Sequence, residues 1–141
     1  ITKTANEQIG FSHPGEQNWN HISFCAFCGP LSSTPTGLQG KSAVAVRPGK
    51  IDRSPTGTAV SARMALMHAK GLLQIGQTFD AFSIINSKFT GRIVREENVS
   101  GKPAIIPEIT GRAWITGTHQ HFLDPDDPWP EGYRLKDTWG F

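Results

Sequence analysis

Apolar side chains recur at helical spacing in one stretch of the chain, residues 59–70. Val60, Met64 and Met67 stand four and three residues apart, so on a helix they form one apolar face. A second, close-packing face is expected from alanines at three positions: Ala62, Ala65 and Ala69. The stretch is rich in residues that favour helix, and Gly71 follows it as a stop signal. The pattern predicts a central helix that is buried by sheet on several sides.

The residues in front of this helix predict a binding site for an anion. Ser54 is expected as the N-cap and Pro55 as the first helical residue, where a missing N–H costs nothing. The backbone N–H groups of Thr56, Gly57 and Thr58 would then be unpaired at the positive end of the helix dipole. Such a site suits a carboxylate or a phosphate, and the missing Cβ of Gly57 lets the anion approach closely.

Asp52 extends this prediction from an anion to an amino acid. Its carboxylate stands two residues before the expected N-cap, where it can hold a cationic amine beside the bound anion. An anion pocket next to a carboxylate is what an amino acid requires. The alternative interpretation is an ordinary capped helix after a Gly-containing turn, and spacing alone weighs the two about equally.

The other apolar segments are short and bounded by turn residues, which is typical of strands. Strands are expected at 22–28, 41–46, 78–86, 88–95, 103–109 and 112–118. A Ser/Thr/Pro/Gly-rich loop is expected at 31–40, a turn at Pro48-Gly49, and the end of a helix at 1–8. Fifteen Gly and ten Pro among 141 residues suit a turn-rich β protein of one domain with one main helix.

Composition narrows the class of protein. The net charge of +2 is nearly balanced, which favours neither nucleic acid nor an acidic surface as a partner. No apolar run is long enough to span a membrane and no signal peptide is recognisable, so we expect a cytoplasmic protein without membrane contact. Because the chain begins with Ile rather than Met, we interpret it as a truncated or processed piece.

Two groups of residues resemble metal ligands, and neither predicts a metal site. Cys25 and Cys28 are three apart, which on a strand points them to opposite faces, so we expect structural, buried cysteines. His119 and His121 would share a face of a strand, but no distant motif supplies a further ligand. The Pro-rich segment 124–139 is instead expected to pack its aromatic side chains on the barrel rim. His68, far along the helix, is expected to be a surface or half-buried histidine.

The segment Asp52-Arg53-Ser54-Pro55-Thr56-Gly57-Thr58, followed by Ser61-Ala62-Arg63, resembles the second catalytic motif of the proline racemase family. Matching flanks lie at 5–8, 13–14, 22–24, 111–117 and 126–133. The family includes proline racemases, 4-hydroxyproline 2-epimerases and trans-3-hydroxy-L-proline dehydratases. The similarity covers essentially the whole chain but only the C-terminal part of such an enzyme, because nothing matches the Met-Cys-Gly-His-Gly type motif of the other half.

This resemblance implies an α+β fold of the diaminopimelate-epimerase type. Two similar domains each wrap a β-barrel-like sheet around a central helix, and the active site lies between the two helix N-termini. Residues 1–141 would be the C-terminal catalytic portion, one half of the two-domain enzyme. Residues from about 112 to 141 would be an extension that packs on the N-terminal domain. The implied partners are that N-terminal half and, in a homodimer, a second copy.

The resemblance also implies the chemistry. In the racemases and epimerases two cysteines, one from each half, act on the α-proton, and Thr56 stands where the second would be. A thiol has a reference pKa of about 8.5, whereas a threonine hydroxyl is far less acidic and only relays a proton or orients water. This substitution matches the dehydratase branch, in which one cysteine takes the α-proton and the 3-hydroxyl leaves as water.

The expected activity is therefore that of a hydro-lyase, converting trans-3-hydroxy-L-proline to pyrroline-2-carboxylate without a cofactor. Thr56 is the expected catalytic residue; Gly57 and Thr58 would bind the carboxylate of the imino acid, and Asp52 its ring nitrogen. The isolated chain is expected to be inactive, because the base belongs to the other half. Two alternatives stay open: a proline racemase or 4-hydroxyproline 2-epimerase of the same family, and a non-catalytic imino-acid-binding fragment.

Overall fold

A computed structural model describes residues 1–46 and 49–133 of the chain. The elements follow in the order α1 (Thr2–Gln8), β1 (Cys25–Thr34), β2 (Gly37–Val46), β3 (Lys50–Ile51), α2 (Gly57–Ala69), β4 (Thr78–Phe82), β5 (Lys88–Val99) and β6 (Lys102–Thr110). The helix expected near the N-terminus is confirmed as α1, whereas the turn expected at Pro48-Gly49 lies partly outside the described residues. No helix in the described part of the chain combines the length and the apolar character needed to cross a membrane.

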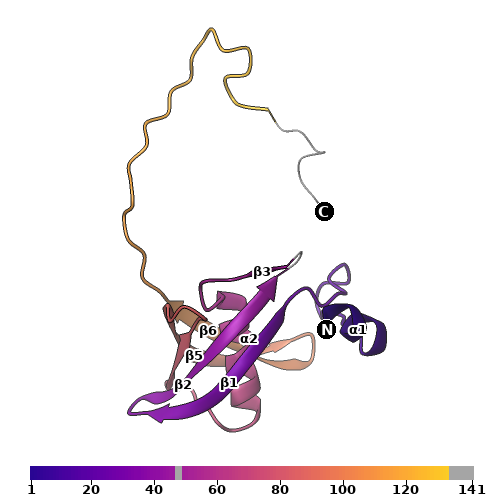
Figure 1. Cartoon of the computed structure of the whole chain (residues 1–141). Helices are drawn as coiled ribbons and strands as arrows, with labels where there is room; N and C mark the ends of the chain where they lie inside the picture. Colours follow the sequence, from indigo (N-terminus) through magenta and orange to yellow (C-terminus); the bar gives the residue numbers. More distant parts are fainter. Residues whose placement is uncertain (47–48, 134–141) are drawn as a thin grey trace.

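The strands form one mixed sheet of six strands. The order is β1-β2-β4-β5-β6, and the short β3 pairs with the end of β2. Neighbouring strands are antiparallel except β2 and β4, which run parallel because the chain between them crosses over through α2. The sheet curves around α2, which lies behind β1 and β2 in Figure 1 and packs against β5 and β6. The predicted α+β fold with a curved sheet around one central helix is confirmed.

The apolar face predicted for the helix forms the core. Val60, Met64 and Met67 are at most 3% exposed and pack with four buried side chains from the connection and the sheet: Leu73, Phe79, Ala81 and Ile93. Gly91 on β5 permits this close packing, because a Cβ there would lie 2.5 Å from the Sδ atom of Met64. The second face was predicted wrongly, since Ala62 and Ala69 are exposed. The sheet covers α2 on one side and leaves its other side in solvent.

The loop predicted at 31–40 is wrong, because β1 and β2 form a tight hairpin across that region. Thr34 pairs directly with Gly37, and only two residues connect the strands. The Ser/Thr-rich composition concealed a strand because β1 is the edge of the sheet and is largely exposed, so it does not need apolar side chains. Elsewhere β4 ends at Phe82, earlier than predicted, and β5 continues to Val99.

The segment 111–133 forms no helix or strand, so the strand predicted at 112–118 is wrong. It leaves the end of β6 and runs in a long arc away from the sheet (Figure 1). Trp114, Phe122 and Trp129 are 62–79% exposed, so these aromatic side chains do not pack on the barrel rim as predicted; residues 134–139 of that prediction lie outside the described part. The physical reason is that β6 is the last strand of the sheet, and no other described segment pairs with its continuation.

Candidate active site

The loop before α2 is built by short-range hydrogen bonds from side chains to backbone. The Ser54 N–H donates to Oδ1 of Asp52 at 2.9 Å, and the Thr56 N–H donates to Oγ of Ser54 at 3.1 Å. Each bond spans two residues, which is the pattern of Asx and Ser turns and competes with helix formation. The helix therefore begins at Gly57 with Thr56 as its N-cap residue, and the prediction of Ser54 as N-cap is wrong.

Thr56 has a backbone conformation that its residue type rarely adopts. Its φ is 62° and its ψ is 104°, in the positive-φ region that disfavours β-branched side chains. Such a conformation costs on the order of 1–3 kcal/mol and persists only where surrounding contacts fix it. Its effect is to turn the chain sharply into α2, so that the Thr56 hydroxyl stands at the helix entrance. Residues held in this way are concentrated at functional sites.

The Thr56 hydroxyl is bound to Asp52. Its Oγ1 donates a hydrogen bond of 2.5 Å to Oδ2 of Asp52, while the other carboxylate oxygen accepts from the Ser54 amide. The Thr56 hydroxyl and then the Ser54 amide hold the pKa of Asp52 below its ordinary value of 3.8, because both stabilise the charged form. Asp52 is thus a half-buried carboxylate that keeps free lone pairs for a further donor such as an ammonium group.

Two of the three amides predicted to bind an anion remain available. The Thr56 N–H is used by Ser54, but no side chain caps the helix, and the N–H groups of Gly57 and Thr58 donate to no acceptor in the described residues. A Cβ built on Gly57 would have no neighbour within 4 Å, so the space in front of these amides is open. The helix entrance can therefore bind an anion through two backbone N–H groups.

Contacts from other strands fix the loop in place. The Asp52 N–H donates to the Val44 carbonyl oxygen at 3.0 Å, which ties the loop to β2. Ser87, in the turn between β4 and β5, donates from Oγ to the Arg53 carbonyl oxygen at 2.7 Å and contacts the buried Ser83 hydroxyl at 2.7 Å. This serine pair was not predicted from the sequence, because nothing in its spacing distinguishes it from ordinary turn residues.

The cysteine pair and the histidine pair belong to β1 and to the segment after β6. Cys25 and Cys28 are free cysteines on β1; Cys28 is exposed, so its expected burial is wrong, because β1 is an edge strand. His119 and His121 stack at 6.2 Å in a segment without strand structure. Among the described residues, no group of three or more His, Cys, Asp and Glu side chains is placed to hold a metal ion.

Comparison with known proteins identifies the family. The family model described as proline racemase matches residues 1–134. The chain belongs to the proline racemase family. A probable proline racemase from Agrobacterium radiobacter, solved with bound carbonate, shares 36% identity over 99% of this chain with a TM-score of 0.73. A hydroxyproline epimerase from Agrobacterium vitis, solved with bound trans-4-hydroxy-L-proline, also shares 36% identity over 99% of it, with a TM-score of 0.72.

These matches confirm the diaminopimelate-epimerase-like fold expected from the resemblance, with this chain as one half of such an enzyme. The chain spans only 40% and 39% of the two solved chains. The loop at 52–58 and the start of α2 lie within the residues that the family model matches.

Proposed function

We propose that this chain supplies the threonine-containing half of an enzyme that dehydrates trans-3-hydroxy-L-proline to pyrroline-2-carboxylate. The observation that carries the proposal is the strained Thr56, whose hydroxyl lies at the entrance of α2 and hydrogen-bonds to Asp52. Two-base racemisation would need a group at this position that is easily deprotonated. A threonine hydroxyl is not such a group, but it is a competent donor to a departing hydroxyl.

Substrate recognition in this proposal uses both charges of the imino acid. The carboxylate binds the free N–H groups of Gly57 and Thr58, where the helix dipole stabilises it and the enediolate that develops from it. The ring ammonium binds Asp52, which remains ionised because its pKa is lowered. The ammonium neutralises the carboxylate of Asp52, which weakens its hydrogen bond from Thr56 and lets the Thr56 O–H turn toward the substrate.

The chemical step is an elimination. A base on the N-terminal half removes the α-proton, and the C–H electron pair forms a double bond between Cα and Cβ. The bond between Cβ and the 3-hydroxyl oxygen breaks, and the hydroxide leaves as water after it takes a proton from Thr56, directly or through a water molecule, which solvent then replaces. The resulting enamine tautomerises to the imine form of pyrroline-2-carboxylate. These steps use no cofactor.

We also propose that the residues after about 112 form an extension that packs on the N-terminal half of the enzyme. Large apolar side chains along it are exposed here, among them Trp114 (70%) and Ile115 (94%). Exposed apolar side chains at this density are typical of segments that are covered by another part of the assembly. A homodimer and a cytoplasmic location are further proposals that accompany the enzyme assignment.

A second candidate function is racemisation or 4-hydroxyproline 2-epimerisation. It is favoured by the similarity to two solved relatives, a probable proline racemase and a hydroxyproline epimerase. A third, binding of an imino acid without catalysis, follows if the N-terminal half is absent from the native protein. The native mass separates the last two cases, because a mass near 15.4 kDa leaves only the half described here.

The experiment that tests the proposal supplies the intact protein with L-proline, trans-4-hydroxy-L-proline and trans-3-hydroxy-L-proline in parallel. The proposal expects consumption of the 3-hydroxy substrate alone, with pyrroline-2-carboxylate as the product. Formation of D-proline, or of the C2 epimer of 4-hydroxyproline, would contradict it and support the racemase or epimerase assignment. Binding of the three compounds without turnover by a protein that contains both halves would contradict both catalytic assignments.

A further inference from the structure

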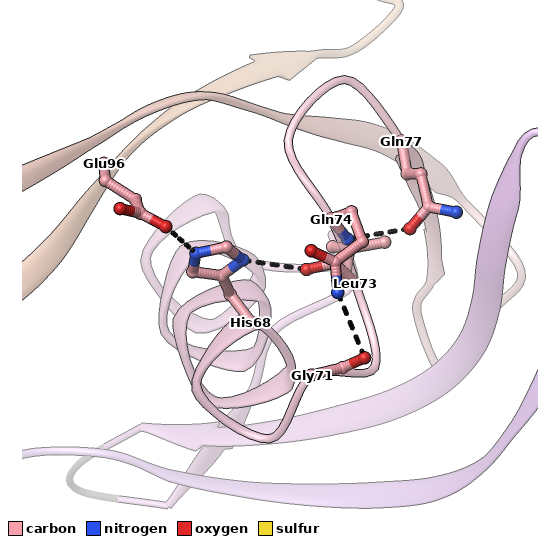
Figure 2. A network of polar contacts seen from close by, with 6 residues as sticks. All are labelled: His68, Gly71, Leu73, Gln74, Gln77 and Glu96. Carbon is pink, nitrogen blue, oxygen red and sulfur yellow. Dashed lines mark hydrogen bonds and ion pairs between the residues drawn. The ribbon is translucent and has the colours of Figure 1, made fainter.

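His68 lies at the end of α2 farthest from the candidate active site, and its ring is held on both nitrogens (Figure 2). Nδ1 is 2.9 Å from the carbonyl oxygen of Leu73, in the connection between α2 and β4. Nε2 is 2.9 Å from Oε1 of Glu96 on β5. One imidazole ring therefore joins the end of the helix, the following connection and a strand of the sheet.

The chemistry of the two partners fixes the protonation state of the ring. A backbone carbonyl oxygen only accepts hydrogen bonds, and an ionised carboxylate also only accepts. Neutral imidazole carries one N–H, so it can satisfy Leu73 or Glu96 and must turn a lone pair toward the other acceptor. The imidazolium carries two N–H groups and satisfies both. The geometry therefore selects the charged form of His68.

The surroundings of His68 favour the same charge. Hydrogen bonding to the Leu73 carbonyl, followed by the contact with Glu96, raises the pKa of His68 above its ordinary value of 6.5. The other titratable group from β5 in this region is Glu97, which pairs with Arg95 at 3.3 Å. β6 presents only uncharged residues here (Pro103, Ala104 and Ile105), and α2 presents Ala65 and Ala69. The last turn of a helix also attracts a cation.

The connection that His68 holds has few other anchors. Leu73 is fully buried in the core and is the residue whose carbonyl His68 contacts. The rest of the connection is exposed. Its side chains make only internal polar contacts among the described residues, from Gln74 to Gln77 at 2.7 Å and from Gln74 to Gly71 at 3.2 Å (Figure 2). Its backbone has one hydrogen bond to the described strands, from the Gly76 N–H to the Ile93 carbonyl oxygen at 3.2 Å, and the Leu72 N–H donates to the Met67 carbonyl oxygen of α2 at 2.9 Å. His68 is 18% exposed and Glu96 is 68% exposed, so the histidine is the fixed member and the carboxylate can move away.

We propose that His68 is a proton-dependent hydrogen-bonding bridge that holds residues 70–77 and the end of α2 to β5. As the imidazolium it bridges Leu73 and Glu96. On deprotonation it keeps one partner and releases the other, so the connection opens more often. Because the folded state binds this proton more tightly than the unfolded chain, the stabilisation is complete below the ordinary value of 6.5 and is lost as the pH rises through the higher folded-state pKa.

NMR titration of the histidine Cε1–H signals tests this proposal in the full chain, with the signal of His68 assigned from His68→Asn. We expect its proton affinity to be at least about threefold above that of an unperturbed histidine, and to fall at least about threefold in Glu96→Gln. Glu96→Gln changes an exposed side chain, so folding is expected to be preserved. His21→Asn, which removes a histidine outside this network, serves as the matched control and should leave the signal of His68 unchanged.

Hydrogen exchange gives a second readout. After correction for the intrinsic rate, the amides of residues 72–77 should open at least about threefold more often at about pH 8.5 than at about pH 6. This pH difference should be reduced in Glu96→Gln and retained in His21→Asn. Titration of His68 at or below 6.5, or equal opening of the connection at both pH values, would overturn the proposal.

Discussion

The hydroxyl of Thr56 donates a hydrogen bond of 2.5 Å to the carboxylate of Asp52, four residues earlier in the chain. This bond joins the proposed catalytic residue to the proposed ligand of the substrate nitrogen. In the proposed mechanism, an ammonium group bound to this carboxylate neutralises its charge, which weakens the bond from Thr56 and lets the Thr56 O–H turn toward the substrate.

Replacing Thr56 by cysteine tests the role of the hydroxyl. In the intact enzyme, Thr56→Cys should slow dehydration by about 100-fold or more, because S–H is only a weak hydrogen-bond donor and the larger sulfur shifts the proton away from the position of the Thr56 Oγ1. The same variant should gain exchange of the α-proton of L-proline with solvent, measured as deuterium incorporation. Thr56→Ser, which keeps the hydroxyl, is the control and should stay within about tenfold of the wild type. Unchanged dehydration in Thr56→Cys would remove Thr56 from the mechanism.

Asp52 should make folding depend on pH in the acid range. Its pKa is lowered in the folded state, so its stabilisation is present above the ordinary value of 3.8 and is lost as the pH falls through the lower folded-state pKa. At about pH 6, Asp52→Asn should reduce the free energy of unfolding by about 1–2 kcal/mol, and the difference should shrink in acid. Urea denaturation of the wild type and Asp52→Asn, from about pH 6 into the acid range, measures the difference in the free energy of unfolding and its decrease in acid. Asp126→Asn, in the exposed segment, is the control; an equal effect of the two substitutions would contradict the prediction.

Gly91 should be intolerant of a side chain. An added methyl group would lie 2.5 Å from Sδ of Met64, so Gly91→Ala should lower the free energy of unfolding by about 1–3 kcal/mol through overpacking of α2 on β5. Thermal or urea denaturation measures the effect. The matched control is Gly15→Ala, where the nearest atom to the new Cβ would be 3.6 Å away. Equal stability of the two variants would show that α2 sits farther from β5.

Ser87 should hold the loop of the candidate site in place. Ser87→Ala removes the hydrogen bond to the Arg53 carbonyl and one partner of the buried Ser83 hydroxyl, at an expected cost of about 1–3 kcal/mol. Hydrogen exchange at Ser54 and Thr56 should accelerate more than exchange in the core of α2. Ser32→Ala, on the exposed edge strand, should change neither quantity. If the loop amides of Ser87→Ala are as well protected from exchange as those of the wild type, Ser87 does not hold the loop in place.

The parts of the fold that the sequence predicted are those in which side-chain pattern and burial coincide. The core face of α2 was predicted from Val60, Met64 and Met67, because their spacing matches a helix and no polar residue interrupts it. The hairpin of β1 and β2 was predicted as a loop, because an exposed edge strand tolerates Ser and Thr. The strand expected at 112–118 is absent from the structure. Its residues suit a strand, but a strand also needs a neighbouring strand to pair with, and no local sequence pattern specifies that neighbour.

For the candidate site, the sequence indicated the residues but not their arrangement. An anion-binding helix end was predicted from Pro55 and Gly57, and two of its three expected amides donate to no acceptor within residues 1–46 and 49–133. The actual start of the helix depends on turns closed by Asp52 and Ser54 side chains, which compete with helix capping and are hard to rank from sequence. The positive φ of Thr56 could not be anticipated, because it is imposed on a residue that intrinsically avoids it.

The most direct test of the proposed dehydration follows trans-3-hydroxy-L-proline and the intact enzyme in deuterated water by proton NMR. We expect the signals of the substrate to be replaced by those of pyrroline-2-carboxylate, while L-proline supplied in the same tube keeps its α-proton and its configuration. Loss of the α-proton signal of L-proline together with formation of D-proline, and survival of the 3-hydroxy compound, would contradict the assignment.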